Sequence, residues 1–108
     1  LVTLSAQHPL AVEPNVLAAF AALEAGILQT ALAAARRACF LAATEPICHF
    51  LMGACLDQLR EPRQARLHYE AAAALLHKVA DSASPLPYGE GLTGHQLQRI
   101  LDGYLLGT

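Results

Sequence analysis

The clearest pattern in this chain lies in residues 44–79, which read TEPICHFLMGACLDQLREPRQARLHYEAAAALLHKV. Apolar residues recur there at three- and four-residue steps, the spacing that puts side chains on one face of an α-helix. One set is Ile47, Phe50, Leu51, Ala54 and Cys55, and the next is Ala65, Tyr69, Ala72, Leu75 and Leu76. Pro46 and Pro62 suit first turns, because proline has no N–H to leave unpaired there, and Thr44 is the expected N-cap. The stretch predicts two helices, ending at about Leu59 and Val79 and joined by a tight turn.

The same arrangement recurs 34 residues earlier, over residues 12–45. Residues of the same or similar size return at this offset: Leu17/Leu51, Ala19/Gly53, Ala31/Ala65, Ala38/Ala72 and Leu41/Leu75. Small side chains at fixed offsets mark where two helices approach closely. Gly26 is expected to end a helix in the left-handed conformation, and Arg60 occupies the equivalent place. A period of about 34 residues with helix–turn–helix content indicates a helical repeat array, and such arrays commonly present binding surfaces.

The chain is predicted to be all-α, with two helix–turn–helix repeats and a C-terminal capping helix. Residues 1–13 are interpreted as an N-terminal linker, 14–43 as the first and more degenerate repeat, and 44–79 as the second. The second helix of the first repeat, from about Leu28 to Ala43, carries Phe40 on an apolar face. Residues 80–92 are rich in Pro, Gly and Ser and predict a loop. Thr93 and Gln96 form a capping-box pattern that opens a helix over 93–106. Its apolar face is Leu97, Ile100, Leu101, Tyr104 and Leu105.

Composition narrows the class of protein. Apolar residues make up 55% of the 108 positions and charged residues 15%, so a packed domain is expected. The net charge of −2 and the lack of a basic run disfavour nucleic acid. No uninterrupted apolar run is long enough for a membrane span. The start at Leu1 has neither an initiator Met nor a signal-peptide layout, so we expect a fragment of a longer protein. Three cysteines within helical patterns favour reduced thiols in the cytoplasm.

The second repeat resembles a known family. Gly53, Leu56, Ala65, Tyr69 and Ala72 are arranged as in the tetratricopeptide repeat, in which two antiparallel helices pack through small and aromatic positions. In the first copy, Ala19 stands for the glycine and Ala35 for the aromatic residue. The resemblance implies a stack of helix pairs whose first helices line a concave side.

A narrower resemblance covers residues 44–106. Glu45–Gly53, Ala65–Ala72 and the ending Leu86-Pro87 followed by Gly89-Glu90-Gly91-Leu92-Thr93 are similar to the repeat tail of certain chemotaxis receptor methyltransferases. That family implies an upstream domain that uses S-adenosylmethionine to esterify receptor glutamates. No methyltransferase part lies within this chain, so no cofactor is expected here.

The expected partner-binding surface is the concave side. The residues predicted to face it are Val16, Phe20, Leu23, Glu24, Phe50, Ala54, Asp57 and Gln58. Some repeat domains hold a peptide carboxylate with lysine and asparagine there, but Val16, Phe20 and Leu51 fill those places in this chain. An apolar groove with an acidic edge instead suits an amphipathic helix. The alternative is that Phe20 and Phe50 belong to the core.

Other groupings point only weakly to chemistry. Cys48, His49 and Cys55, or His68 with His77, lack the four converging ligands of a zinc site. Cys39 would need a lowered thiol pKa to act as a nucleophile. Among the arginines, Arg63 and Arg66 could hold a phosphate, although Glu70, four residues after Arg66, favours an ion-paired surface.

The predicted function is a non-catalytic protein-interaction module that docks a methyltransferase-type parent protein on a chemoreceptor, a response regulator or its own catalytic domain. Self-association as a homodimer is the alternative. A small standalone enzyme is the least favoured reading.

Overall fold

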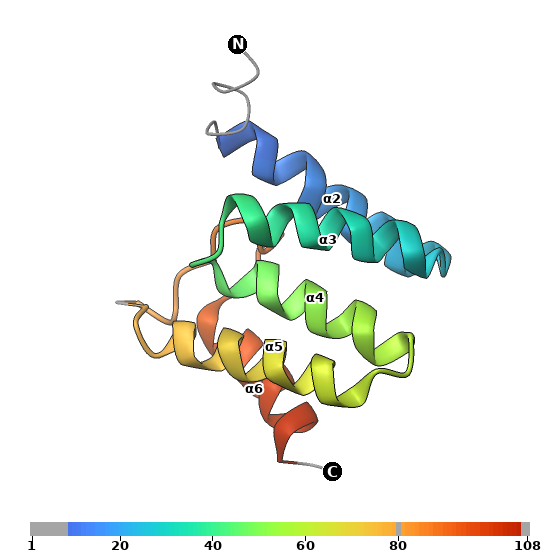
Figure 1. The fold of residues 1–108 in the computed structure, drawn as a ribbon. Helices are drawn as coiled ribbons and strands as arrows, with labels where there is room; N and C mark the ends of the chain where they lie inside the picture. Colours follow the sequence, from blue (N-terminus) through green and yellow to red (C-terminus); the bar gives the residue numbers. More distant parts are fainter. Residues whose placement is uncertain (1–8, 80, 107–108) are drawn as a thin grey trace.

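The computed structural model describes residues 9–79 and 81–106. Within them lie five helices and no strand, which confirms the all-α prediction. The helices are α2 (Pro9–Ala25), α3 (Leu28–Leu41), α4 (Pro46–Gln58), α5 (Pro62–Leu76) and α6 (Gly94–Leu105), as Figure 1 shows. None of them is long and apolar enough to cross a membrane.

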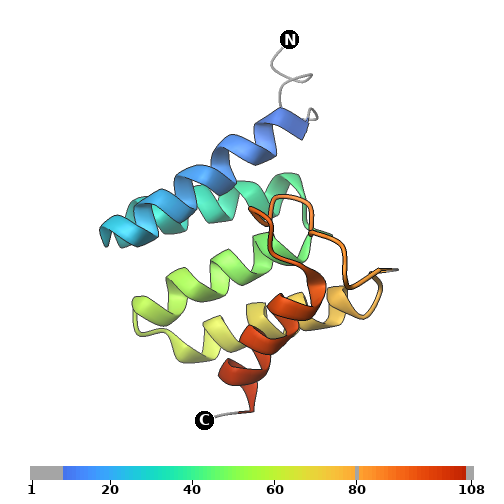
Figure 2. The same ribbon diagram turned by 180° about the vertical axis from the view of Figure 1, so that it is seen from behind.

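The helices pack in pairs that follow the order of the chain. α2 packs on α3, α3 on α4, α4 on α5, and α6 covers α5. Seen from behind in Figure 2, α2 and α6 lie in front of α3 and α5. The two views therefore place α2 and α6 on one side of the molecule and α3 and α5 on the other.

The small side chains that recur at the 34-residue offset are all buried. Ala19, Ala31 and Ala38 are buried, as are their partners Gly53, Ala65 and Ala72 at the 34-residue offset. Leu41 and Leu75 are only half-buried, and Leu17 is 43% exposed although Leu51 is in the core. The 34-residue repeat therefore predicts the burial of the small residues correctly and that of the larger apolar residues less well.

Both helix pairs turn through the same hydrogen-bonded motif. The Ile27 amide donates to the Ala22 carbonyl (2.9 Å), and the Glu61 amide donates to the Leu56 carbonyl (2.9 Å). Gly26 and Arg60 have φ values of 77° and 64°, so both are left-handed, as predicted. This is the Schellman arrangement, in which the residue after the left-handed one closes the last helical turn.

Several helix boundaries differ from the sequence prediction, and α3 ends at Leu41 rather than Ala43. α2 begins at Pro9, with Pro14 inside it, because buried Val12 extends the helical apolar face upstream of the expected start. The remainder of the predicted linker, residues 1–8, lies outside the described residues. Thr44 is not an N-cap: Glu45 holds that position and makes no side-chain capping bond. α5 ends at Leu76, slightly earlier than expected.

The C-terminal segment closes over α5. The Gln96 amide donates to Thr93 Oγ1 (3.2 Å) and the Thr93 amide donates to Gln96 Oε1 (2.9 Å), which confirms the capping box. Leu97 and Leu101 are fully buried. The Tyr104 ring stacks on Tyr69 of α5 with ring centres 4.4 Å apart. These contacts attach α6 to the second helix pair.

Candidate interaction groove

A hollow of about 630 Å³ lies where α2, α4, the loop 89–92 and α6 meet. Helices from both ends of the described chain, α2 and α6, contribute to it, and Figure 2 turns these two helices toward the reader. The residues that line it are Phe20, Glu24, Phe50, Gly89, Glu90, Gly91, Leu92, Gln96 and Ile100. The groove thus unites three of the residues predicted for the concave side with residues of the C-terminal segment.

Phe20 and Phe50 are at once core and groove residues. Each is partly buried and packs on the core, while each also lines the hollow. The Phe50 ring lies 6.2 Å from that of Tyr69, tilted by 36°, an arrangement that aromatic pairs favour. The interior thereby holds one side of the Phe50 ring in place, and the groove is preformed.

The charge of the groove is negative. Glu24 and Glu90 line it and are exposed, and no basic side chain of the described residues joins them. Glu90 sits in a left-handed conformation with φ of 53°, next to Gly91 with φ of 90°. A side chain on Gly89 would lie 3.2 Å from the carbonyl oxygens of Leu86 and Leu92. This tightly folded loop holds Glu90 at the rim.

The remaining predicted concave residues divide among other environments. Val16 is 1% exposed and belongs to the core, so its prediction as a groove residue is wrong. Leu23 and Ala54 are half-buried and Gln58 is exposed, but none of them lines the groove. Asp57 lines a separate hollow beside Arg63, Arg66 and Tyr69.

Sequence reasoning missed the C-terminal half of the groove. Ile100 and Gln96 belong to the predicted capping helix, and residues 89–92 to the predicted loop. No local pattern relates them to Phe20, because they meet only after α6 has folded back over the first four helices. The one signal in the sequence was the wide apolar face of the last helix, which includes Ile100 as well as the two residues that become fully buried, Leu97 and Leu101.

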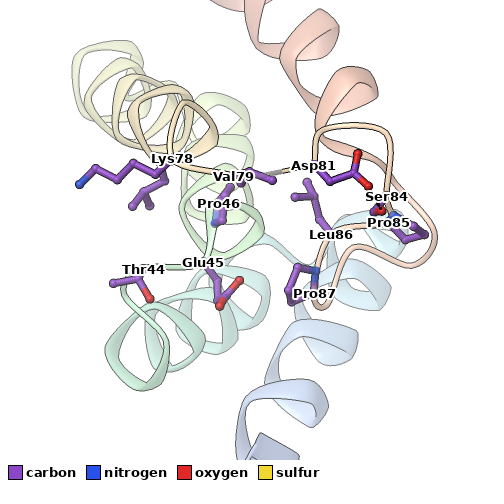
Figure 3. Close-up of a pocket in the computed structure, with 11 residues that line it drawn as sticks. Thr44, Glu45, Pro46, Lys78, Val79, Asp81, Ser84, Pro85, Leu86 and Pro87 are labelled. Atoms are coloured by element: carbon purple, nitrogen blue, oxygen red, sulfur yellow. Dashed lines mark hydrogen bonds between the residues drawn. The ribbon is translucent and has the colours of Figure 1, made fainter.

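A second hollow of about 450 Å³ lies between the start of α4, the end of α5 and the loop 81–87, and Figure 3 shows its side chains. Its charged groups do not converge. Asp81 accepts hydrogen bonds from Ser84 Oγ (2.7 Å) and the Ala83 amide (3.0 Å), which lower its pKa and stabilise the turn. The Lys78 side chain points away from Glu45, whose pKa burial raises.

The three cysteines are free thiols, and their surroundings raise the thiol pKa instead of lowering it. Burial raises the pKa of Cys39 and of Cys55 to about 11. Burial, then the neighbouring Cys39 and Glu45, raise that of Cys48 to about 12. Reactive cysteines need the reverse shift.

His68 does not pair with His77, the histidine with which the sequence groups it. His68 lies against His49, with their Nδ1 atoms 3.3 Å apart, while His77 is exposed. Within residues 9–79 and 81–106, His, Cys, Asp and Glu form no group of three or more that could hold a metal ion.

The prediction for Arg66 and Glu70 on α5 is confirmed, whereas that for Phe40 on α3 is not. Arg66 Nε pairs with Glu70 Oε2 at 3.1 Å, which confirms the ion-paired surface of α5. Phe40 is 86% exposed, so its assignment to an apolar packing face is wrong. Phe40 follows Arg36 and Arg37 on α3. These three residues, together with Ala33 and Leu41, line a shallow hollow of about 460 Å³. The neighbouring helices cover the alanine side of α3 and leave this side open.

Comparison with protein-family models, with curated proteins and with solved structures found no match.

Proposed function

We propose that this chain is a non-catalytic protein-interaction module of the tetratricopeptide-repeat type, and that its groove binds a basic amphipathic helix. The observation that carries the proposal is the pairing of an apolar floor, Phe20, Phe50 and Ile100, with a rim of Glu24 and Glu90. An amphipathic helix binds in such a groove through apolar anchors at helical spacing. Lysine or arginine beside those anchors would meet the two carboxylates.

Two further features support binding by this face. Ile100 is a large apolar side chain that remains 37% exposed at the groove, although the adjacent Leu101 is fully buried. Exposed apolar groups that gather in a hollow with polar edges are typical of interaction sites. The capping box and the 89–92 loop hold the C-terminal wall rigidly, which reduces the entropy lost on binding.

We also propose that the parent protein is a cytoplasmic receptor methyltransferase dependent on S-adenosylmethionine. In it the module would dock the enzyme on a chemoreceptor, a response regulator or its own catalytic domain. The support is the resemblance of residues 44–106 to the repeat tail of that family. The gene sequence upstream of Leu1 tests this part. A region with a strand followed by a glycine-rich loop is expected, and any other kind of domain would overturn the methyltransferase link alone.

A synthetic peptide tests the groove directly. The probe is a labelled amphipathic helix with leucines on one face and flanking lysines, and binding is followed by fluorescence anisotropy. The wild-type chain should bind it, with affinity falling as salt is added. The double variant Glu24→Arg/Glu90→Arg and the single variant Ile100→Asp should each bind at least about tenfold more weakly.

Matched controls separate the groove from general stickiness. Leu67→Asp alters an apolar residue of α5 that is 66% exposed and away from the groove, so it should leave binding unchanged. A peptide with glutamate in place of lysine should bind more weakly than the basic one. Circular dichroism of each variant checks the fold. Equal binding by the wild type and the groove variants would refute the proposed site.

A further inference from the structure

The outer face of α3 has the chemistry of the ligand proposed for the groove. Ala33, Arg36, Arg37 and Phe40 are all exposed and follow the i, i+3, i+4, i+7 spacing of one helical face. Phe40 supplies a large apolar side chain, and the two arginines supply positive charge beside it. This face, the α3 surface, is therefore a short basic amphipathic helix held on a folded domain.

The groove and the α3 surface are complementary in charge and in polarity. The charged residues of the groove are Glu24 and Glu90, whereas those of the α3 surface are Arg36 and Arg37. Each site also has large apolar side chains beside its charged residues: Phe20, Phe50 and Ile100 in the groove, and Phe40 on the α3 surface. Arg37 is already oriented, because its Nε donates to Asn15 Oδ1 of α2 at 2.9 Å. Oppositely charged edges around apolar centres are the usual basis of orientation between two proteins.

One molecule cannot join its own two sites. α3 is fixed between α2 and α4 through buried Ala31, Ala34 and Ala38. The two views place α3 on the side of the molecule opposite α6, which forms one wall of the groove. The α3 surface can reach a groove only on another copy of the chain.

We propose that the α3 surface of one copy docks in the groove of a second copy, with Phe40 between Phe20 and Phe50 and the arginines facing Glu24 and Glu90. This inference rests on the proposed function, since it assigns an occupant to the same groove. The contact joins two different surfaces, so each added copy leaves one groove and one α3 surface unfilled. Such a heterologous contact builds chains of copies unless the rotation between them closes a ring.

Paired variants test the arrangement. Sedimentation velocity of the wild-type chain over a dilution series should show association that increases with concentration and weakens with salt. Phe40→Asp removes the docking residue, and Glu24→Arg/Glu90→Arg reverses the charge of the groove. Each of these variants alone should be monomeric. Mixed together they should form a complex of one copy of each, because an intact groove then meets an intact α3 surface.

Leu67→Asp is the matched control, since it removes an exposed apolar side chain outside both surfaces, and it should associate as the wild type does. Three results would overturn the inference: a wild-type chain that stays monomeric at millimolar concentration, a mixture of the two variants that forms no complex, or loss of association in Leu67→Asp.

Failure of self-docking can be distinguished from failure of the groove as a binding site. A chain that stays monomeric but binds the basic peptide, with Glu24→Arg/Glu90→Arg abolishing that binding, would refute self-docking and leave the groove as a site for another protein. If both hold, the peptide should dissociate the assemblies, because it competes for the same groove.

Discussion

Tyr69 of α5 lies directly against Gly53 of α4, so closely that a Cβ atom on Gly53 would fall 2.5 Å from Tyr69 Cε1. The Tyr69 ring cannot easily move away, because it is buried and stacks on Tyr104 of α6. Burial, and then Tyr104, raise the pKa of Tyr69. One glycine thus allows a contact that links α4, α5 and α6.

Gly53→Ala should lower the free energy of unfolding by about 1–2 kcal/mol, because overpacking outweighs the better helix propensity of alanine. Urea denaturation measures the change. Gly103→Ala is the matched control: it lies in α6 with nothing within 4 Å of the added Cβ. There alanine should raise stability by about 0.5–1 kcal/mol. Equal effects at the two sites would contradict the close contact.

The two left-handed turn residues should respond in opposite directions to substitution. Arg60→Gly should raise the free energy of unfolding by up to about 1 kcal/mol, because glycine adopts a φ of 64° without steric cost. Gly26→Ala should lower it by about 1 kcal/mol, since no neighbouring atom within 4 Å adds a second effect. Thermal and urea denaturation of both variants would show whether the signs differ.

The capping box should contribute to stability only at α6. Thr93→Ala should cost about 1 kcal/mol, because the Gln96 amide loses its acceptor. Thr44→Ala should change stability by less than about 0.5 kcal/mol, since Thr44 is exposed and does not cap α4. A loss at Thr44 as large as that at Thr93 would show that Thr44 caps the helix in solution.

His68, which lies against His49, should make stability depend on pH. His49 Nε2–H donates to the Ala43 carbonyl (2.8 Å), so its Nδ1 accepts from His68 Nδ1–H. Burial, and then His49, lower the pKa of His68. The unfolded chain therefore binds the proton more readily, and the free energy of unfolding should fall as the pH drops below about 6.5.

Urea denaturation between pH 5 and pH 8 measures this dependence, a range set by the ordinary histidine pKa of about 6.5. His68→Gln should flatten the dependence, whereas His77→Gln, which alters an exposed histidine, should leave it as in the wild type. An unchanged slope in His68→Gln would contradict the lowered pKa of His68.

The local features of the fold could be predicted from the amino-acid sequence. Helical spacing of apolar residues, the left-handed positions at Gly26 and Arg60, and the Thr93–Gln96 capping box all depend on interactions within a few residues of the chain. The recurring small residues, such as Ala31 and Ala65, also predicted buried positions, which the structure confirms.

Tertiary packing decided which faces of those helices are covered. Val16 and Phe20 lie on the same predicted face, yet the first is core and the second lines the groove. Phe40 has a core-like side chain but is exposed, because α2 and α4 cover the opposite side of α3. Glu90 and Ile100 reach Phe20 only through the path of the C-terminal segment. Periodicity orients side chains around a helix axis, but burial and binding depend on what lies across from each side chain, and distant parts of the chain supply that.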